Sequence, residues 1–560
     1  LAESYEFNRG TSVELVPLRE EIVGNVRISL LVLYGAVLVL LSIACFNVAN
    51  LIVARSMTRR HEIAVRMSIG ASRTAIIRQL LVECVLLASM GGVLGVLFAA
   101  WTLAALASLT PPEIVPLADL RLDVPILLYA LALTLLTGVA IAFVPGIATT
   151  GSSLAASLHS STRTVTHAPH SRQVLVVGQV AMTVVLLCGA GLLVRTLIAL
   201  ENVDTGFDRR DLLTMEVNLP DARYGHGRAV DFFSRARERL QLLPGAAEAA
   251  AAYSLPVTGG VFSGTGFHVL GQPELPRSET PSTGVRVVTP GYFRTLGIPV
   301  LRGREFTDAD QRPNAEPVFV VNQTFASRFL QGLDPLTAAI SVRVDENNPY
   351  GRIVGVVGDV SEGSVRNTAR PTVFYNHGQQ PVDDMVLILR STGAASLTTA
   401  AANAVRELDA GVAIGDVRTM DSVLGDNVAR ERLTALVSSA FAVSGLLLAS
   451  LGLYGLLAFV VAERTKEIGI RIALGARLAG LLAAVLGGGL RLIVIGAAIG
   501  ISGAMIVTRS LGSLLFRVTP YDPWTYAAVL MMLGAVAGAA MLIPARRAAT
   551  VDPATTLRAE

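Results

Sequence analysis

The chain has 560 residues, of which 52% are hydrophobic and only 16% are charged, and its formal net charge is +3. A soluble globular domain has about 25% charged residues, so this composition indicates a protein that lies in lipid. The net charge is too small to indicate a nucleic-acid partner, and no Lys/Arg-rich run with interleaved aromatic residues occurs. We therefore expect membrane lipid, and no nucleic acid, among the partners of this chain.

Seven apolar stretches are long enough to cross a hydrocarbon core of about 30 Å, which takes roughly 20 helical residues. The predicted spans are, in chain order, 28–54, 79–109, 124–148, 173–194, 433–462, 480–510 and 524–545. Lipid offers the backbone no hydrogen-bond partner, so these spans must be helices. The predicted fold class is therefore membrane α-helical, with about seven transmembrane helices.

The charges of the short loops predict the orientation of these helices. Arginine and lysine are concentrated in the loops 55–78, 149–172 and 463–479 and in the C-terminal tail. The opposite loops, near 110–123 and 511–523, have one arginine each beside acidic residues. The positive-inside rule places the basic loops in the cytoplasm. The predicted localisation is the bacterial inner membrane, as a multi-pass protein with residues 201–431 on the periplasmic or extracellular side.

Segment 201–431 has ordinary charge and many turn residues, which indicates a folded domain outside the membrane. Its helical patterns are Ala229–Leu242, Asn322–Leu330 and Leu397–Leu408, and its strand-like runs are Leu212–Leu219, Val318–Val321, Ile353–Val357 and Met385–Leu389. Strands mixed with helices predict an extracytoplasmic α+β domain. We expect two subdomains, because the Pro/Gly/Ser-rich piece 271–284 interrupts the first half.

The helix predicted at 173–194 is expected to continue beyond the membrane as a stalk. No Gly or Pro occurs between Leu192 and Thr205 to break it. The helix should therefore run to about Val203, and Gly206 should end it.

The membrane part contains an internal repeat. The sequence EIAVRMSIGA, which starts at Glu62, returns as EIGIRIALGA at Glu467, each time between two long apolar stretches. The second copy has a helix and an external domain before its three helices, whereas only residues 1–27 precede the first copy. We therefore expect residues 1–27 to be the tail of a truncated first external domain, with one helix also missing. A natural seven-helix protein is the alternative.

The repeated motif, Glu-Ile-x-x-Arg-x-x-x-Gly-Ala, is the strongest candidate for function. On a helix, Glu62 and Arg66 are four residues apart with the acid first, which makes a favourable pair on one face. Gly70 is placed to end that helix. A single copy would indicate a solvated surface helix, but two copies at equivalent places favour a docking surface for a partner.

Several stretches together resemble the MacB/FtsX-type ABC transporter permeases. They are Ala44–Asn50 with the loop that follows, Val461–Ala476, Thr289–Ile298, Arg302–Phe306, Pro544–Ala549 and Val551–Pro553. The external stretches are similar to the MacB-like periplasmic core domain, and the repeat is similar to the duplicated (tandem) orphan permeases of this superfamily. The implied domains are a first FtsX-like permease unit at 28–148, a cytoplasmic linker at 149–172, a helix and stalk at 173–200, the periplasmic core at 201–431, and a second permease unit with a cytoplasmic tail at 432–560.

The resemblance implies a mechanism called mechanotransmission. A separate ABC ATPase subunit moves cytoplasmic coupling helices, and the long helices carry that motion to the periplasmic domain. The coupling residues that the resemblance implies are Glu62, Arg66, Gly70, Glu467, Arg471 and Gly475. A periplasmic adaptor or envelope protein is a further expected partner. The alternative with the same architecture is an FtsX-like regulator or scaffold of a periplasmic partner such as a cell-wall hydrolase.

Other site chemistry finds no support in the sequence. A P-loop needs a lysine in Gly-Lys-Ser/Thr, and the one lysine, Lys466, lies in Arg-Thr-Lys-Glu, so any ATP would bind a partner chain. His159, His167 and His170 lie in a Ser/Thr-rich segment without a Cys or acid beside them, so no metal site is predicted. We expect no enzyme activity, no catalytic or cofactor-binding residue and no cofactor in this chain.

A secondary transporter is the less favoured alternative. Ion-coupled carriers usually have an acid or histidine near the middle of the membrane, and the central parts of the predicted spans have neither. Arg491 lies within a predicted span, and we expect it to extend toward the membrane surface rather than to be buried for function. Cys45, Cys84 and Cys188 lie in or beside apolar stretches, which predicts burial rather than a disulfide framework.

Overall fold

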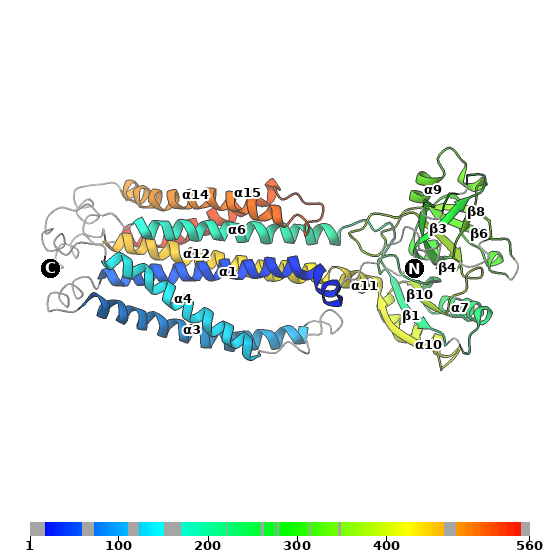
Figure 1. Cartoon of the computed structure of the whole chain (residues 1–560), viewed down its shortest axis with the longest axis horizontal. Coiled ribbons are helices and arrows are strands. Elements are labelled where there is room, and N and C mark those ends of the chain that lie inside the picture. Colours follow the sequence, from blue (N-terminus) through cyan, green and yellow to red (C-terminus); the bar gives the residue numbers. More distant parts are fainter. Residues whose placement is uncertain are drawn as a thin grey trace. The chain divides into compact units, whose positions relative to one another are not determined.

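The computed structural model describes residues 17–58, 72–109, 123–150, 170–220, 222–258, 262–273, 275–276, 279–312, 315–344, 349–463 and 478–549. The chain splits into a helical unit, Pro17–Ala199 with Glu431–Glu560, and an α/β unit, which includes Leu200–Arg430. Figure 1 shows long helices in the first unit and strands with short helices in the second.

Long helices form the described part of the helical unit. They are α1 (Leu18–Thr58), α3 (Arg73–Leu109), α4 (Val124–Thr150), α6 (His170–Glu201), α12 (Ala429–Glu463), α14 (Leu478–Ser510) and α15 (Pro523–Ala549). Six of them contain an apolar run long enough to cross a membrane, and the described side chains of α4 form a shorter apolar run, Val124–Val139. Every predicted span is therefore helical. Helix α1 begins at Leu18, ten residues before the predicted start of the first span, and residues 1–16 lie outside the described part.

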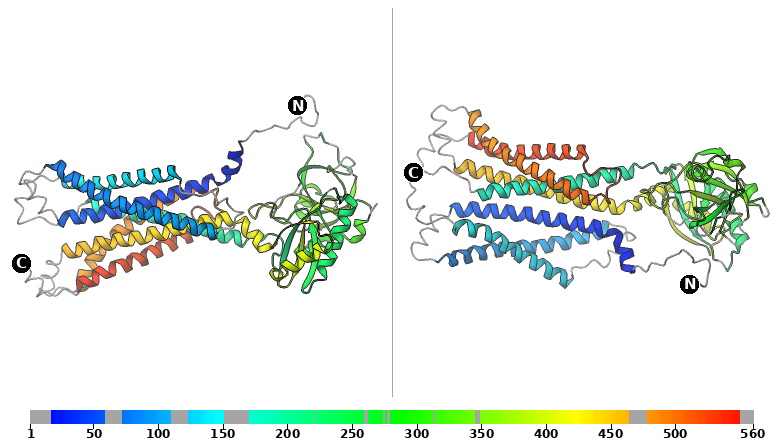
Figure 2. Two further views of the ribbon diagram at one scale, coloured as in Figure 1. Left: turned by 90° about the horizontal axis from the view of Figure 1, so that it is seen from below. Right: turned by 45° about the horizontal axis from the view of Figure 1, so that its top comes forward.

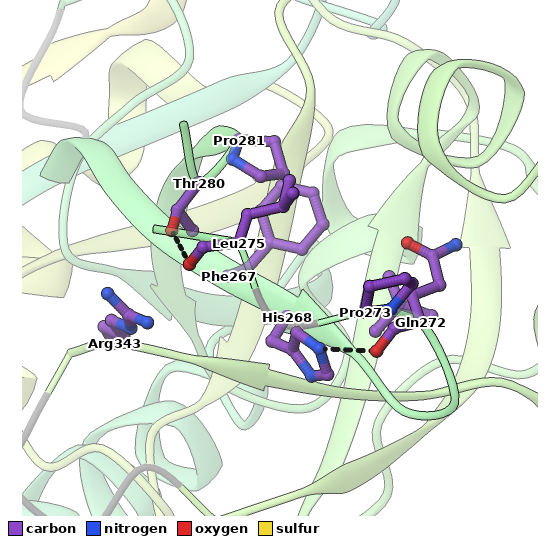
Figure 3. Close-up of a pocket in the computed structure, with 9 residues that line it drawn as sticks. Phe267, His268, Gln272, Pro273, Leu275, Thr280, Pro281 and Arg343 are labelled. Atoms are coloured by element: carbon purple, nitrogen blue, oxygen red, sulfur yellow. Dashed lines mark hydrogen bonds between the residues drawn. The ribbon is translucent and has the colours of Figure 1, made fainter. Parts of the chain in front are cut away.

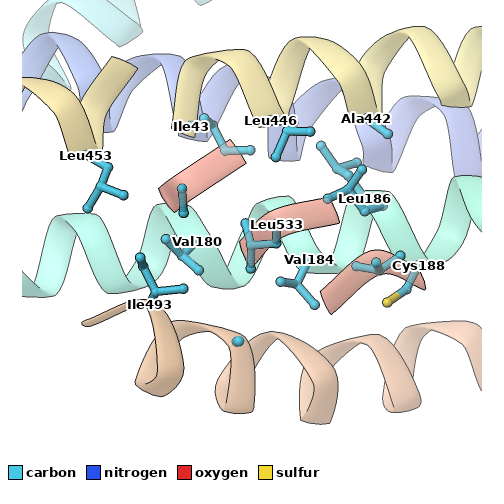
Figure 4. Close-up of a cluster of buried hydrophobic side chains, with 14 of the residues drawn as sticks. Ile43, Val180, Val184, Leu186, Cys188, Ala442, Leu446, Leu453, Ile493 and Leu533 are labelled. Carbon is cyan, nitrogen blue, oxygen red and sulfur yellow. The ribbon is translucent and has the colours of Figure 1, made fainter. Parts of the chain in front are cut away.

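Helix α6 lies at the centre of the helical unit. Over an 18-residue apolar window of α6, 56% of the residues are buried, compared with 11% in the window of α1 and 6% in that of α3. Its Val180, Val184 and Leu187 side chains belong to a buried cluster that also contains residues of α1, α12, α14 and α15 (Figure 4). Helix α6 therefore holds together helices from both copies of the repeat.

Helices α3 and α4 pack side by side (Figures 1 and 2), and α1 also packs on α4. Gly92 of α3 comes so close to Thr134 of α4 that an added Cβ would lie 2.9 Å from the threonine side chain. Elsewhere α3 has exposed apolar side chains, such as Leu94, Phe98 and Trp101. In a membrane these side chains face lipid.

The cysteines agree with the prediction of burial. Cys84 and Cys188 are buried, Cys45 is half-buried, and all three are free thiols. Cys84 of α3 packs against Ala49 of α1 in a small separate cluster.

The predicted stalk is confirmed as a continuous helix. Helix α6 runs through Arg195 without a break and ends at Glu201, two residues before the predicted end. Gly206 then has a φ of +80°, and a Cβ at this position would lie 2.0 Å from the carbonyl oxygen of Asp359. Only glycine fits both the backbone angle and the space, so Gly206 fixes the turn that leads into the α/β unit.

The α/β unit has a first lobe made from the two ends of its chain. Its elements are β1 (Leu212–Asn218), α7 (His226–Gln241), β2 (Ala246–Ala252), β10 (Asp384–Ser391), α10 (Thr398–Arg406) and β11 (Ala413–Thr419). The strands form an antiparallel sheet in the order β11-β1-β10-β2, which is the ferredoxin-like arrangement. Alternate residues of β1, such as Leu213 and Met215, share a core with Phe233 of α7 and Val405 of α10.

A second lobe is inserted between β2 and β10. Its main strands are β3 (Phe262–Val269), β4 (Ser282–Val288), β6 (Val318–Asn322), β7 (Ala339–Val342), β8 (Gly351–Val357) and β9 (Thr372–Asn376). They pair in the order β4-β3-β7-β8-β6-β9, and β9 then pairs in parallel with β4. The sheet therefore closes into a barrel, whose core contains Phe267, Val287 and Phe319. The remaining described elements are β5 (Val300–Gly303), α8 (Tyr292–Leu296), α9 (Gln323–Phe329), α11 (Met420–Asn427) and the 3-10 turns Asp308–Gln311, Pro335–Thr337 and Ala394–Leu397.

A buried ion pair anchors one part of the barrel. Arg286 of β4 is fully buried, and its Nη2 donates to Glu362 Oε2 at 2.5 Å while its Nη1 donates to the Tyr292 hydroxyl at 3.2 Å. Removing one charge of such a pair leaves the other buried without a partner, which costs about 3–5 kcal/mol. The pair therefore ties β4 to α8 and to the segment before β9.

The helices and strands predicted within 201–431 are confirmed, each to within a few residues of its bounds. The structure has two lobes with separate buried clusters. The described parts of segment 271–284, however, lie within the barrel lobe and do not separate the two lobes. The separation comes instead from the insertion between β2 and β10.

Candidate coupling seam

The six predicted coupling residues, Glu62, Arg66, Gly70, Glu467, Arg471 and Gly475, lie outside the described residues. Their assignment stays a prediction. The structure describes the helices on either side of them, because α1 ends at Thr58 and α3 begins at Arg73, while α12 ends at Glu463 and α14 begins at Leu478. The candidate site within the described residues is the packing of α6 against the helices that lead to the two motifs.

Three helices meet at a group of polar side chains, the half-buried Asn47 of α1 with the buried Gln179 and Thr183 of α6, which we call the inner polar seam. Asn47 Nδ2 donates to the Leu448 carbonyl oxygen of α12 at 2.8 Å. Gln179 Nε2 donates to the same oxygen at 2.7 Å and to Asn47 Oδ1 at 3.3 Å. Thr183 Oγ1 donates to the Gln179 carbonyl oxygen at 2.9 Å, and the Gly445 carbonyl oxygen of α12 is an alternative acceptor at 3.4 Å. The seam thus joins the first copy of the repeat to the second through α6.

Gly452 gives the two amides access to α12. A Cβ at this position would lie 2.5 Å from Asn47 Oδ1 and 2.5 Å from Gln179 Oε1. A carbonyl oxygen has two lone pairs, so beside its bond within the helix the Leu448 oxygen has one further lone pair, which the two amides share. A larger residue than glycine would push the amides away from that oxygen.

The inner polar seam contains amide and hydroxyl groups, and none of its three side chains titrates near neutral pH. Gln179 is 2% exposed and Thr183 is fully buried. Hydrogen bonds between membrane helices contribute about 0.6 kcal/mol on average and at most about 1.7 kcal/mol. What the seam can do is fix the register of α6 against α1 and α12.

The sequence prediction covers one residue of this seam and misses two. Asn47 lies in the stretch Ala44–Asn50, whose resemblance to known permeases the sequence shows, whereas Gln179 and Thr183 have no place in the prediction. An ion-coupled carrier would have an acid or a histidine in its spans, and Gln179 and Thr183 are neither. Their signal is a pair of polar residues four positions apart in an apolar helix, which places both on one face.

At the other end of α6 a charged group fixes the helix to α15, and we call Arg195, Asp522 and Thr525 the outer clamp. Arg195 Nη1 makes an ion pair with Asp522 Oδ2. Asp522 precedes the first residue of α15, and its Oδ2 accepts from the Thr525 backbone N–H at 2.9 Å and from Thr525 Oγ1 at 2.6 Å. The carboxylate is therefore the N-cap of α15, where negative charge is also favoured by the helix dipole.

The protonation of Asp522 follows from these contacts. Desolvation by its surroundings raises the pKa of the carboxyl, but the hydrogen bonds from Thr525 and the charge of Arg195 outweigh it and hold the pKa below its ordinary value. Asp522 is therefore ionised at neutral pH, and the outer clamp is closed.

Helix α14 approaches α6 through two glycines. A Cβ at Gly496 would lie 2.8 Å from the Val180 Cβ, and a Cβ at Gly500 would lie 2.7 Å from the Ala181 carbonyl oxygen. Small residues four positions apart let two membrane helices come close enough for backbone contact. Helix α6 is therefore fixed to the second copy of the repeat along much of its length.

The α/β unit has a small cavity of about 60 Å³ beside β3, lined by residues that include His268 and Gln272 (Figure 3). The His268 ring contacts the Tyr350 hydroxyl at 2.7 Å and the Gln272 carbonyl oxygen at 3.0 Å. Pockets for small ligands usually measure about 300–1,000 Å³, so this cavity does not fit a drug-sized molecule. Among the described residues no group of three or more His, Cys, Asp or Glu side chains could hold a metal ion. His159 and His167 lie outside those residues.

Apolar helices from two repeat copies, a central helix and an α/β unit between the copies in the chain define a multi-pass membrane protein with a folded external domain. The family model of the FtsX-like permease C-terminal domain matches residues 34–158 and 439–553. The model of the MacB-like periplasmic core domain matches residues 174–432. The chain belongs to the MacB/FtsX-type ABC transporter permeases, lies in the inner membrane, and has the α/β unit as its periplasmic domain.

Curated relatives match part of the chain. The macrolide export ATP-binding/permease protein MacB of Hahella chejuensis is 26% identical over 299 residues, which are 51% of this chain and 44% of that protein. The pyoverdine export ATP-binding/permease protein PvdT of Pseudomonas putida is 27% identical over 278 residues, which are 47% of this chain and 41% of that protein. The chain thus spans less than half the length of these relatives. The crystal structure of the periplasmic region of MacB from Actinobacillus actinomycetemcomitans aligns with 39% of this chain. The alignment covers 92% of the MacB chain, with 15% sequence identity and a TM-score of 0.27.

Proposed function

We propose that this chain is the permease subunit of an ABC exporter whose ATPase is a separate chain, and that it converts ATP hydrolysis in the cytoplasm into movement of its periplasmic domain. One observation carries the proposal. Helix α6 is continuous from His170 to Glu201, is bonded to both permease units at the inner polar seam, and leads along the chain into β1 of the periplasmic domain.

In the proposed route, movement of α1 and of α12 is passed to α6. The ATPase binds the two repeated motifs, at Glu62 and Glu467, which follow α1 and α12 in the chain. Both helices are hydrogen-bonded to α6 through Asn47 and the Leu448 carbonyl oxygen. A shift of either helix is then passed to α6, and the outer clamp makes the helices of the second unit move with it.

Within these 560 residues no nucleotide-binding motif can be written. The single lysine, Lys466, is in no Gly-Lys-Ser/Thr motif, so the chain has no P-loop lysine for the β- and γ-phosphates of ATP. The purified chain should therefore hydrolyse no ATP alone. Turnover that an antibody against the chain removes together with the protein would contradict this part of the proposal.

The coupling step is tested with the double variant Glu62→Ala/Glu467→Ala and an ABC ATPase encoded beside this chain. Surface ion pairs contribute only about 0–1 kcal/mol to stability, so the variant should reach the membrane at the normal level. A docking surface depends more strongly on charge placement. We therefore expect weaker co-purification of the ATPase and lower stimulated ATP hydrolysis, with each single variant in between.

Glu316→Ala is the matched control for this test. Glu316 is an exposed acid in a surface ion pair with Arg352, at 3.3 Å, but it lies in the periplasmic domain. It should leave ATPase association unchanged. A double variant that behaves like this control would show that the two motifs are solvated surface helices.

The same helices would also serve a regulator of a cell-wall hydrolase. Full-length protein assembled with its ATPase would then retain and stimulate a hydrolase, and would export nothing from reconstituted vesicles. That result would favour the FtsX-like role over export while leaving the coupling route intact.

A further inference from the structure

Arg491 of α14 is a cation within an apolar run that extends from Gly487 to Ser510. Its side chain is exposed, and within the described part of the chain it has neither an ion pair nor a hydrogen bond. Its neighbours Leu490, Val494 and Ile495 are exposed apolar residues. An exposed apolar face of a membrane helix is covered by lipid, so the partner of this charge must be sought there.

The direction of α14 brings the Arg491 side chain toward the cytoplasmic surface. Side chains of a helix lean toward its N-terminus and lie over the residues three and four positions earlier. For Arg491 these residues are Gly488 and Gly487, and an added Cβ at either would have no atom within 4 Å. Because α14 begins on the cytoplasmic side, the guanidinium extends toward the inner headgroups over an open space left by two missing side chains.

A second arginine gives the depth of this site. Arg509 follows Arg491 by 18 residues in α14. At about 1.5 Å per residue the two positions are about 27 Å apart along the helix, close to the hydrocarbon thickness of about 30 Å. This spacing allows the two guanidinium groups to reach opposite edges of the hydrocarbon layer, with that of Arg491 extending to the inner phosphates.

We propose that Arg491, with the open space at Gly487 and Gly488, binds the phosphate of an anionic phospholipid of the inner leaflet. The planar guanidinium makes two parallel hydrogen bonds to a phosphate, and the apolar neighbours contact the acyl chains. The site is a property of the second permease unit. Leu86 of α3 occupies the equivalent place in the first unit, since each residue follows its motif glutamate by 24 positions.

The site is tested by native mass spectrometry of the full chain in detergent, titrated with phosphatidylglycerol and with zwitterionic phosphatidylcholine. A basic residue at an anionic surface contributes about 1 kcal/mol, so Arg491→Gln should bind phosphatidylglycerol about fivefold more weakly. Binding of phosphatidylcholine should change less. Arg491→Lys keeps the charge but lacks the planar guanidinium with its two parallel donors. Its affinity for phosphatidylglycerol should lie between those of the wild type and Arg491→Gln.

Two further variants separate the site from general charge effects. Gly488→Leu keeps the arginine and fills the open space, so it should also weaken phosphatidylglycerol binding. Arg509→Gln removes one charge from the same helix and should weaken phosphatidylglycerol binding less than Arg491→Gln does. Each variant is first shown to be monodisperse and to unfold at the wild-type temperature, and Arg491→Lys supplies the comparison if Arg491→Gln is unstable.

Three results would overturn the proposal. Arg491→Gln could bind phosphatidylglycerol as tightly as the wild type, or Arg509→Gln could lose as much binding as Arg491→Gln. Inorganic phosphate could bind the lipid-free protein and lose that binding in Arg491→Gln, in which case the ligand is a soluble anion rather than a lipid.

Discussion

In the second permease unit, α12, α14 and α15 all contribute buried residues to the cluster around α6, whereas among the described residues of the first unit only Ile43 of α1 does so. The buried share of an 18-residue apolar window is 39% for α12, 28% for α14 and 28% for α15, against 11% for α1 and 6% for α3. The two units have the same sequence motif and equivalent sets of three helices. Contact with α6 is therefore what distinguishes a buried helix from an exposed one.

Equivalent glycines make the difference visible. Gly91 and Gly95 of α3 follow Glu62 by 29 and 33 residues, as Gly496 and Gly500 of α14 follow Glu467. The α14 pair lies against α6, while a Cβ at Gly91 or Gly95 would have no atom within 4 Å. The same small-residue pattern thus packs on a helix in one unit and not in the other.

The largest effect is expected from replacing these glycines. Gly496→Leu/Gly500→Leu should lower the free energy of unfolding in detergent by about 1–3 kcal/mol for each site, because overpacking displaces the α6 backbone. Gly91→Leu/Gly95→Leu should be neutral or slightly stabilising, since leucine is a better helix former than glycine by up to about 1 kcal/mol. Denaturant unfolding of both double variants measures the contrast. Equal losses would mean that the first unit also packs on a helix through this face.

A smaller effect is expected at the link between the units. Gly452→Ala should displace the amides of Asn47 and Gln179 from the Leu448 carbonyl oxygen and cost about 1 kcal/mol, since such hydrogen bonds contribute about 0.6 kcal/mol each. Gly455→Ala, on the same helix, should be neutral or stabilising, because an added Cβ there has no atom within 4 Å.

A double-mutant cycle with Asn47→Leu and Gln179→Leu measures the link itself. The expected coupling energy is about 0.6 kcal/mol, the average for such pairs in a membrane. Strictly additive losses would show that the two amides do not cooperate and that the units meet without this seam.

An effect of similar size is expected at the start of the last helix of each unit. Asp522→Ala removes the cap of α15 and should cost about 1 kcal/mol, within a range of about 0.5–2 kcal/mol. Asp123 precedes α4 in the same way, but its exposed side chain makes no hydrogen bond within the described residues, so Asp123→Ala should cost less.

Acid should remove this last difference. Because the folded pKa of Asp522 lies below its ordinary value, its stabilisation is complete above the unfolded pKa of about 3.9 and is lost as pH falls through the lower, folded value. Wild type and Asp522→Ala should therefore unfold alike in strong acid and differ at neutral pH. A difference that persists in acid would point to packing rather than charge.

Local patterns predict most of the elements, because periodicity and turn residues are local properties. The strands at Leu212–Leu219 and Met385–Leu389 are both predicted, but their pairing as β1 and β10 joins segments about 170 residues apart, which no local pattern contains. The early start of α1 is missed for a similar reason. Arg19, Glu20 and Glu21 form helices readily but lower the hydropathy that defines a predicted span.

The candidate site is predicted less completely than the fold. Asn47 belongs to a stretch with a recognisable resemblance, whereas Gln179 and the Leu448 carbonyl oxygen become partners only when three helices meet. A backbone acceptor has no signature in a side-chain sequence. The repeated motif predicts where a partner docks, and the structure adds how the helices beside it are joined.

The place of the barrel lobe in the chain has an evolutionary consequence. The lobe leaves the first sheet at Ala252 and returns at Asp384, and these strand ends belong to the neighbouring strands β2 and β10, which pair at Ala252 and Val386. An insertion whose two ends are close together can be lengthened, shortened or replaced without moving the strands that hold it. The barrel lobe can thus diversify among descendants of one ancestor, each acquiring a new specificity, while the ferredoxin-like lobe and its chain connections to α6 and α12 are kept.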